Sequence, residues 1–159
     1  MKHLYLMRHG YSKKTDVSDF LKPLSVKGNK EVLVQAEQFK LPTGIRPDCI
    51  YCSTSVRTKQ TADLLKTVFT GVPVFYRESL YLAPSYRIMD VIKETDEIFQ
   101  RIMVIGHHPG LEQTIGVLAD NGNIQLLKPA DCAVLSLNIS RWTDLKTACG
   151  HLEQIYAAV

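Results

Sequence analysis

The chain has 159 residues, of which 45% are hydrophobic and 22% charged, and its formal net charge is +3. This length and composition fit a single globular domain, predicted over residues 1–159, with a substantial core. Lysines and arginines are spread along the sequence without a long basic run, so we expect no binding to nucleic acid or to a membrane surface.

Strands and helices are predicted to alternate through the first half of the chain. In order, the apolar patterns indicate a strand at 3–8, a helix at 26–40, a strand at 48–52 and a helix within 53–69. Ser25 is the expected N-cap of the first helix, and Ser53 or Ser55 that of the second. The second helix then carries Arg57 in its first turn, close to the end of the preceding strand.

The second half continues the alternation and completes a sheet. It contains a short strand at 73–76, a helix at about 87–98, a strand at 101–106, a helix that starts near Pro109, and strands at 132–139 and 151–157. This order predicts an α/β fold, a three-layer α/β/α sandwich with a mostly parallel central sheet. The last two strands are expected to add an antiparallel extension.

Three polar segments follow the ends of separate predicted strands. Arg8 and His9 come after the first strand, Arg57 after the second and His107 after the strand at 101–106. Ligands of such folds bind at the carboxyl ends of the strands, so these side chains are predicted to converge. Two guanidinium groups suit a tetrahedral oxyanion such as a phosphoryl group. One neutral histidine, His9 or His107, could attack phosphorus, while the other could remain protonated among the phosphoryl oxygens and stabilise their charge.

Motifs for other phosphate chemistries are missing from the sequence. It has no G-x-x-x-x-G-K-[ST] loop, no G-x-G-x-x-G after a strand and no tight group of carboxylates for magnesium. We therefore expect no metal and no cofactor.

The segments "LMRHG", "YCSTSVRTKQTADLL" and "VIGHHPGL" resemble, in this order, the motifs of the histidine phosphatase superfamily, which has the phosphoglycerate mutase-like fold. The short chain and the segment "KPLSVKG" resemble most closely the SixA-type phosphohistidine phosphatases. The resemblance spans about residues 3–120 and implies the same three-layer sandwich. It also implies that His9 is the phosphoacceptor nucleophile, and that Arg8, Arg57 and His107 hold the phosphoryl oxygens.

The sequence departs from the family pattern at several positions. Lys22 stands where an arginine is common and His108 where an asparagine is common, and both are candidates for substrate binding. Tyr11 replaces a residue that is often acidic, and no role follows for it beyond a place at the rim of the pocket. His108 is also placed at this rim, although it could equally be an exposed residue at the start of a helix. Superfamily members that act on esters carry an acid after the middle motif to protonate the alcohol; here Glu78 is the candidate, although it could equally be a solvated charge.

A phosphohistidine substrate needs less acid catalysis than an ester. Its leaving imidazole has a pKa of about 6.5, so the weak case for Glu78 favours phosphohistidine. The short chain also leaves little room for a lid, which suits a phosphorylated protein as partner. The alternatives are a phosphatase of a small phosphorylated metabolite, a phosphate ester, with Glu78 as general acid, and a non-catalytic phosphate-binding domain.

The cysteines and the lack of a long apolar stretch indicate in which cellular compartment the protein is expected. Cys49 and Cys52 form a C-x-x-C pattern, but within a strand these side chains point to opposite faces, which favours buried free thiols in a reducing compartment. No apolar stretch approaches the about 20 residues of a membrane span, and polar residues stand where a signal peptide is apolar. We therefore expect a cytoplasmic protein, and a monomer.

Overall fold

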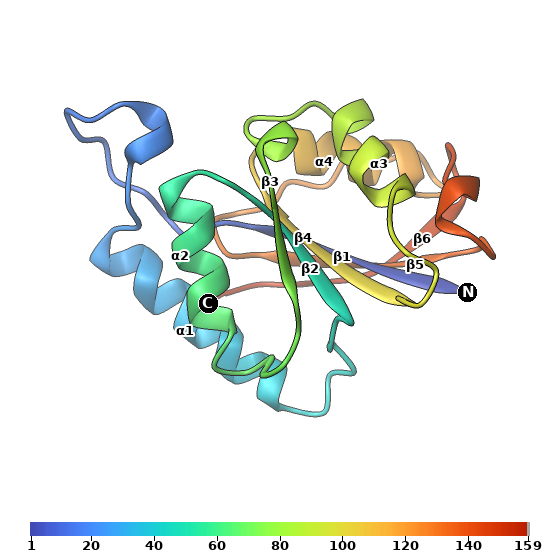
Figure 1. Cartoon of the computed structure of the whole chain (residues 1–159), viewed down its shortest axis with the longest axis horizontal. Coiled ribbons are helices and arrows are strands. Elements are labelled where there is room, and N and C mark those ends of the chain that lie inside the picture. Colours follow the sequence, from blue (N-terminus) through green and yellow to red (C-terminus); the bar gives the residue numbers. More distant parts are fainter. Residues whose placement is uncertain (159) are drawn as a thin grey trace.

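The computed structural model describes residues 1–158 and contains one sheet between two layers of helices (Figure 1). The strands are β1 (Lys2–Arg8), β2 (Cys49–Ser53), β3 (Val74–Arg77), β4 (Arg101–Gly106), β5 (Cys132–Leu137) and β6 (Gly150–Tyr156). The helices are α1 (Val26–Lys40), α2 (Val56–Leu65), α3 (Ser85–Lys93) and α4 (Gly110–Leu118). Three short 3₁₀ turns complete the fold: η1 (Asp19–Leu21), η2 (Glu78–Leu80) and η3 (Trp142–Asp144).

The six strands lie in the order β3-β2-β4-β1-β5-β6. The first four of these are parallel, whereas β5 runs antiparallel to β1 and β6 antiparallel to β5. The predicted mostly parallel sheet with an antiparallel addition is therefore confirmed. Arg8 pairs with Gly106 in the register of β1 and β4, and this pairing puts the residues that follow both strands beside each other.

Two separate hydrophobic clusters form on the two faces of the sheet. Alternate residues of β1 enter different clusters, because successive strand side chains point to opposite faces: Leu4 and Leu6 pack with α3 and α4, and Tyr5 and Met7 with α1 and α2. Figure 1 shows the two helix pairs on opposite sides of the sheet. This arrangement is the predicted three-layer sandwich.

The C-x-x-C pattern belongs to this core. Cys49 lies in the cluster under α3 and α4, and Cys52 in the cluster under α1 and α2. All four cysteines are free and buried, and burial raises the pKa values of Cys49 and Cys52 to about 12. The two thiols therefore face away from each other and are unreactive, as predicted for buried core residues.

The predicted boundaries are close to those of the structure except in α3. This helix was expected at about 87–98 but spans Ser85–Lys93. Beyond it, the side chain of Asp96 accepts a hydrogen bond from the backbone N of Ile98 at 3.0 Å. Such a local bond offers the backbone an alternative to the helix, and the chain turns here before entering β4.

Two glycines let the segment after β1 lie against α1. The carbonyl of Tyr11 accepts hydrogen bonds from the backbone N (3.0 Å) and Oγ (3.2 Å) of Ser25, the N-cap of α1. A Cβ on Gly28 would lie 2.1 Å from the oxygen of Tyr11, and a Cβ on Gly10 would lie 2.7 Å from the oxygen of Gly28. Neither position has room for a side chain, so the position of the loop after His9 depends on both glycines.

Gly28→Ala is predicted to destabilise the protein, although alanine is the better helix former by about 1 kcal/mol. The added methyl group meets the backbone of Tyr11, and such overpacking costs about 1–3 kcal/mol. Urea denaturation measures the change in the free energy of unfolding. Lys30→Ala, at an exposed position of the same helix, is the matched control and should stay within about 0.5 kcal/mol of the parent. A Gly28→Ala protein as stable as this control would contradict the contact.

Candidate active site

A cleft of about 260 Å³ lies at the carboxyl ends of β1, β2 and β4. It is lined by Arg8, His9, Ser12, Asp19, Lys22, Arg57, Leu82, His107 and His108. The cleft therefore brings together all the site residues predicted from the sequence except Glu78. Parallel strands deliver them to one edge, as expected for this fold class.

His9 has its imidazole held in one tautomer. Its Nδ1 lies 2.6 Å from the carbonyl oxygen of Gly10, which can only accept, so Nδ1 carries the proton. Arg57 Nε donates to His9 Nε2 at 3.2 Å, so Nε2 presents its lone pair. Burial lowers the pKa of His9 to about 4, and the charges of Arg57 and Arg8 act in the same direction. His9 is thus neutral at pH 7, with Nε2 free of a proton, as a nucleophile requires.

His107 lies beside His9, with 5.3 Å between the ring centroids. Arg57 Nη2 donates to its Nδ1 at 3.3 Å, so Nε2 carries the proton and donates to Ser53 Oγ at 2.8 Å. Burial, with His9 and Arg57 acting in the same direction, lowers its pKa to about 3. The sequence suggested a protonated second histidine among phosphoryl oxygens; here His107 is neutral, and it would gain a proton only if a phosphoryl group offset the nearby arginine charge.

Arg57 joins both histidines to the loop that contains η1. It is 5% exposed, and it donates from Nη1 to the carbonyl of Asp19 at 2.6 Å and from Nη2 to Asp19 Oδ2 at 3.0 Å. The same carboxylate accepts a hydrogen bond from the hydroxyl of Tyr81 and lies 3.7 Å from Lys22 Nζ. The hydrogen bond from Tyr81, then Arg57 and Lys22, lower the pKa of Asp19. An anion entering the cleft therefore competes with Asp19 for Arg57.

Asp19 and Tyr81 were not singled out in the sequence, and neither was Ser53 in this role. Ser53 was a candidate cap for α2, but Ser55 fills that position and leaves Ser53 for His107. The ring of Tyr81 packs edge-on against His107, with 5.4 Å between centroids. The sequence offered only weak signals for these roles. Asp19 is an acidic residue three positions before Lys22, and Tyr81 is an aromatic residue three positions after Glu78.

Arg8 completes the cationic side of the cleft. Its Nη1 donates to the carbonyl of Leu127 at 2.8 Å, which anchors the side chain. Its Nε is buried and has no hydrogen-bond partner among the described residues. A buried donor without a partner is costly, and an incoming oxyanion would satisfy it. Arg8 is therefore well suited to bind a phosphoryl oxygen.

Glu78 does not reach the cleft, contrary to the role considered for it. It is exposed at the first position of η2, where the chain turns after β3, and it is absent from the residues that line the cleft. Asp19 is the carboxylate that lines the cleft, and it is tied to Arg57 and Tyr81. Glu78 is thus better described as a solvated charge.

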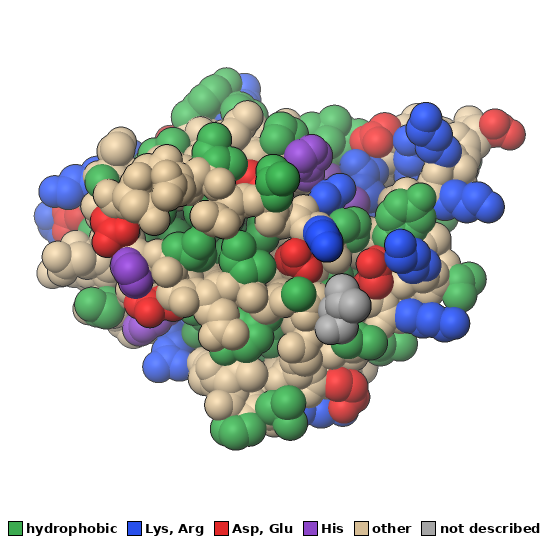
Figure 2. All heavy atoms as spheres, turned by 180° about the vertical axis from the view of Figure 1, so that it is seen from behind, with side chains coloured by type: hydrophobic (Ala, Val, Ile, Leu, Met, Phe, Trp, Pro, Cys, Tyr) green, Lys and Arg blue, Asp and Glu red, His purple; other side chains and the backbone are tan. Residues whose placement is uncertain are grey.

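Tyr11 lies next to the cleft but outside it. It lines a neighbouring hollow of about 590 Å³ that shares Arg8 with the cleft, and Lys27 Nζ lies 5.0 Å from the centroid of its ring. Figure 2 shows lysine and arginine side chains (blue) gathered on the side of the molecule that carries α1 and the preceding loop. Those segments contain Lys13, Lys14 and Lys30 as well as Lys27. The flank of the cleft is thus rich in positive charge.

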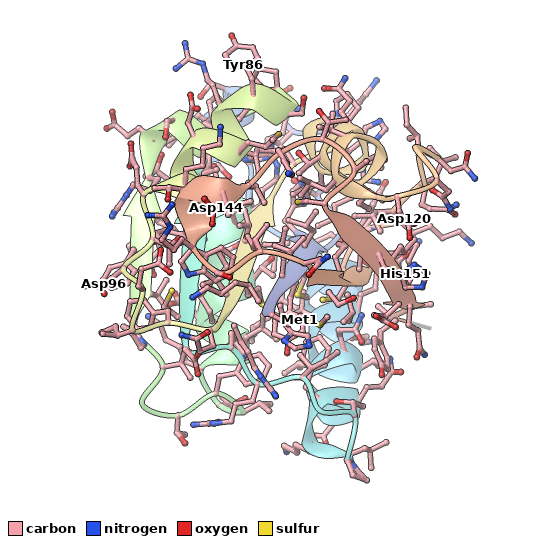
Figure 3. All side chains as sticks on the ribbon, turned by 90° about the vertical axis from the view of Figure 1, so that its right-hand side faces the viewer. Met1, Tyr86, Asp96, Asp120, Asp144 and His151 are labelled. Atoms are coloured by element: carbon pink, nitrogen blue, oxygen red, sulfur yellow. The ribbon has the colours of Figure 1, made fainter. Side chains whose placement is uncertain are left out.

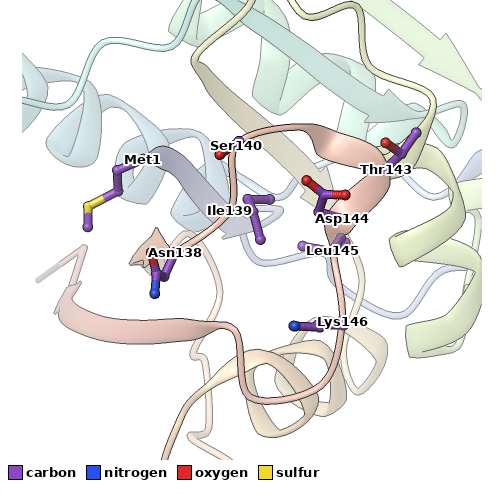
Figure 4. A pocket seen from close by; sticks show the side chains of 8 residues that line it. All are labelled: Met1, Asn138, Ile139, Ser140, Thr143, Asp144, Leu145 and Lys146. Carbon is purple, nitrogen blue, oxygen red and sulfur yellow. The ribbon is translucent and has the colours of Figure 1, made fainter.

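A larger hollow of about 580 Å³ lies at the opposite end of β1, near Met1 (Figures 3 and 4). It is lined by Met1, Asn138, Ile139, Ser140, Thr143, Asp144, Leu145 and Lys146. No histidine or arginine is among these residues, so this hollow lacks the groups that make the smaller cleft suitable for phosphoryl chemistry.

The described residues provide neither a cluster of metal ligands nor a helix suited to crossing a membrane. Over residues 1–158, no group of three or more histidine, cysteine, aspartate or glutamate side chains is placed to hold a metal ion. Within the same residues, none of the helices combines the length and apolar character needed to cross a membrane.

Comparison with solved structures identifies the fold. A chain from Nakamurella multipartitia, named "Putative Phosphohistidine Phosphatase SixA", superposes with a TM-score of 0.86 at 24% identity over 98% of this chain and 95% of its own. The protein histidine phosphatase SixA complexed with tungstate gives 0.84 at 17% identity, covering 98% and 97%. The α-ribazole phosphatase from Shigella flexneri gives 0.71 at 16%, covering 99% and 97%. No protein-family model and no curated protein matches the sequence.

These similarities establish the phosphoglycerate mutase-like fold for this chain. The fold expected from the sequence motifs is therefore confirmed. The neighbours are named for phosphatases of different substrates, so the fold does not select one substrate.

Acid is predicted to destabilise the protein by charging the two buried histidines. Their pKa values of about 4 and about 3 lie below the about 6.5 of an unfolded chain, so the stabilisation is complete above pH 7 and is lost as the pH falls toward 4. We expect the free energy of unfolding, measured in urea, to fall by about 1–2 kcal/mol per histidine between pH 7 and pH 5. The double variant His9→Gln/His107→Gln should lose most of this dependence.

His151→Gln is the control for this experiment, because His151 is exposed on β6. It should keep the pH dependence of the parent. A double variant that loses as much stability in acid as the parent would show that His9 and His107 are not held neutral.

Proposed function

We propose that this protein is a metal-independent phosphatase that removes the phosphoryl group from a phosphohistidine side chain of a partner protein. The observation that carries the proposal is the neutral His9, whose unprotonated Nε2 lies beside Arg57, with Arg8 lining the same cleft. A nucleophilic nitrogen next to fixed guanidinium groups is suited to in-line attack on a phosphoryl group.

The reaction would proceed in two displacements. His9 Nε2 attacks phosphorus, the bond to the substrate nitrogen breaks, and the phosphoryl group is carried on His9 until water displaces it. Arg57 and Lys22 would exchange the carboxylate of Asp19 for phosphoryl oxygens, and Arg8 would donate from its unpartnered Nε. The guanidinium groups are in place before the reaction, and the hydrogen bonds that change are those from Arg57 to Asp19 and to His9 Nε2.

Acid–base considerations favour phosphohistidine over an ester. An alcohol leaves poorly without a proton, whereas an imidazole has a pKa of about 6.5. Asp19 lines the cleft, but its pKa is lowered and it accepts hydrogen bonds from Arg57 and Tyr81, so it is a poor proton donor at neutral pH. Glu78 lies in solvent, outside the cleft.

Two further observations support a protein as the substrate. The positively charged flank along α1 is suited to an anionic partner surface (Figure 2). The neighbour SixA is described as a protein histidine phosphatase and was crystallised with tungstate, which is a tetrahedral oxyanion like phosphate. The cytoplasmic location and the monomeric state remain predictions from the sequence.

The phosphoenzyme provides the direct test. Incubation with a ³²P-labelled phosphohistidine peptide, followed by a rapid quench in alkali, should trap label on the parent protein that is stable in base and labile in acid. His9→Ala should trap none, because His9 is the proposed acceptor, although Nδ1 of His107 also lies unprotonated beside Arg57. His151→Ala, which removes an exposed histidine, is the matched control and should label normally. Label on the His9→Ala protein would rule out His9 as the acceptor.

A substrate panel separates the proposal from its alternatives. We expect turnover of phosphohistidine peptides to exceed that of phosphoserine peptides and sugar phosphates by at least about 10²-fold, since no carboxyl group of the cleft is free to protonate an alcohol. Glu78→Gln should leave all rates within about twofold. A preference for esters that is lost in Glu78→Gln would support the ester phosphatase, and tight vanadate binding without any turnover would support the non-catalytic domain.

A further inference from the structure

A buried carboxylate lies beneath the cleft and has no role in the mechanism described so far. Glu112, in the first turn of α4, is 2% exposed, and its Oε2 lies 2.6 Å from Nδ1 of His108. Its Oε1 is buried without a hydrogen-bond partner among the described residues. The backbone N of Leu127 approaches Oε2 only at 3.5 Å. Burying a carboxylate is costly unless a proton or a cation compensates it. His108 is its hydrogen-bond partner, and Arg8 is a nearby cation whose charged form Glu112 favours.

His108 connects this carboxylate to the reaction space. Its side chain is 50% exposed and lines the cleft together with His9 and His107. With Nδ1 held by Glu112, the nitrogen that remains available is Nε2, which forms no hydrogen bond with a described residue. One edge of the ring is therefore fixed on a buried carboxylate and the other is open. An imidazole oriented in this way by a carboxylate is suited to accept and release a proton.

The other histidines of the cleft are unsuited to this task. His9 is committed to the nucleophilic role by its bonds to Gly10 and Arg57. His107 donates to Ser53, accepts from Arg57, and is neutral at pH 7. His108 is the remaining imidazole in the cleft, and its Nδ1 lies 2.6 Å from the carboxylate of Glu112.

We propose that His108 is the proton-transfer residue of this site and that Glu112 is the positioning residue that orients its ring and stabilises its charge. The inference rests on the proposed phosphatase function. It gives a role to the residue that stands where an asparagine, which cannot transfer a proton, is common in similar sequences.

Over the two displacements, one proton would pass from His108 to the leaving group and one would return to His108 from water. In the first, His9 Nε2 forms a bond to phosphorus, the bond from phosphorus to the substrate nitrogen breaks, and that nitrogen takes the electron pair together with the proton from His108 Nε2. In the second, a water oxygen bonds to phosphorus, the bond to His9 Nε2 breaks with its electron pair returning to His9, and the water proton passes to His108 Nε2. The products are the free amine or imidazole and inorganic phosphate, and both histidines return to their starting states.

The charges around His108 set the direction of each pH effect. The titratable and charged groups that share the cleft with it are Arg8, His9, Asp19, Lys22, Arg57 and His107, and Glu112 faces it from α4. The cationic groups disfavour a protonated His108, whereas Glu112 favours it at a distance of only 2.6 Å. Glu112 is the carboxylate in contact with the ring, so the proposal predicts that removing its charge changes the pH dependence of the reaction.

The test varies the basicity of the leaving group. N-phosphorylated imidazoles and amines are assayed with the parent protein and with His108→Asn, which keeps a side-chain hydrogen-bonding group but cannot transfer a proton. For a phosphorylated amine the variant should lose about 10²-fold in kcat/KM, whereas for N-phospho-4-nitroimidazole, whose leaving group needs no proton, the loss should be below about fivefold. An equal loss for all leaving groups, or no loss, would overturn the proposal.

The role of Glu112 is tested by the pH profile. Glu112→Gln preserves a hydrogen-bond acceptor for Nδ1, so its alkaline limb of kcat should move to lower pH while the rate below that limb is retained. Glu112→Asp keeps the negative charge on a shorter side chain, so its alkaline limb should move less than that of Glu112→Gln. Glu153→Gln, which changes an exposed carboxylate on β6, should leave the profile unchanged. A Glu112→Gln profile identical to that of the parent would overturn the positioning role.

Failure of this inference can be told apart from failure of the proposed function. If His108→Asn still traps base-stable label on His9 but shows no dependence on the leaving group, the phosphatase assignment stands and the role of His108 is wrong. If the parent protein itself traps no label and turns over no substrate, the proposed function fails first. Urea denaturation of each variant checks that a lost rate does not reflect unfolding.

Discussion

The buried side chain of Arg57 is the constraint on which the rest of the site depends. One guanidinium group donates to the nucleophile candidate His9, to His107 and to Asp19, and so connects α2 with the ends of β1 and β4 and with the η1 loop. A buried cation needs acceptors around it. Asp19 provides a carbonyl and a carboxylate, and Tyr81 holds that carboxylate in place. The cleft is thus organised around a cation before any phosphoryl group arrives.

The same charge bears on the proposed attack of His9 on phosphorus. Burial and the nearby guanidinium groups hold the pKa values of His9 and His107 at about 4 and about 3, so both rings are neutral at physiological pH. A neutral His9 has a lone pair to offer, and a cationic neighbour attracts the anion that it attacks. This arrangement costs stability in acid, because folding must then compete with protonation of buried rings. Readiness for catalysis and sensitivity to acid have one physical origin here.

Much of the architecture could be predicted because it depends on local pattern. Alternating apolar residues in β1 and helical spacing in α1 and α2 identify the elements, and a parallel sheet delivers strand ends to one edge. Arg8, His9, Arg57 and His107 follow such ends, so their convergence could be inferred before any contact was known. The end of α3 was missed because neither a glycine nor a proline follows Lys93, and the bond between Asp96 and Ile98 belongs to the turn beyond the helix.

The contacts around these residues needed the tertiary structure. Glu78 and Asp19 are both acidic loop residues in sequence, yet only the folded chain decides that Asp19 reaches Arg57 while Glu78 faces solvent. Likewise, the sequence alone suggests that Glu112 is a charge on the surface of a helix. In the folded chain it is buried beside His108. Sequence alone settled the order of the elements and the cations at the strand ends, because periodicity and topology carry that information. The fold alone settled which carboxylates and hydroxyls meet those cations, because long-range packing sets loop positions and burial.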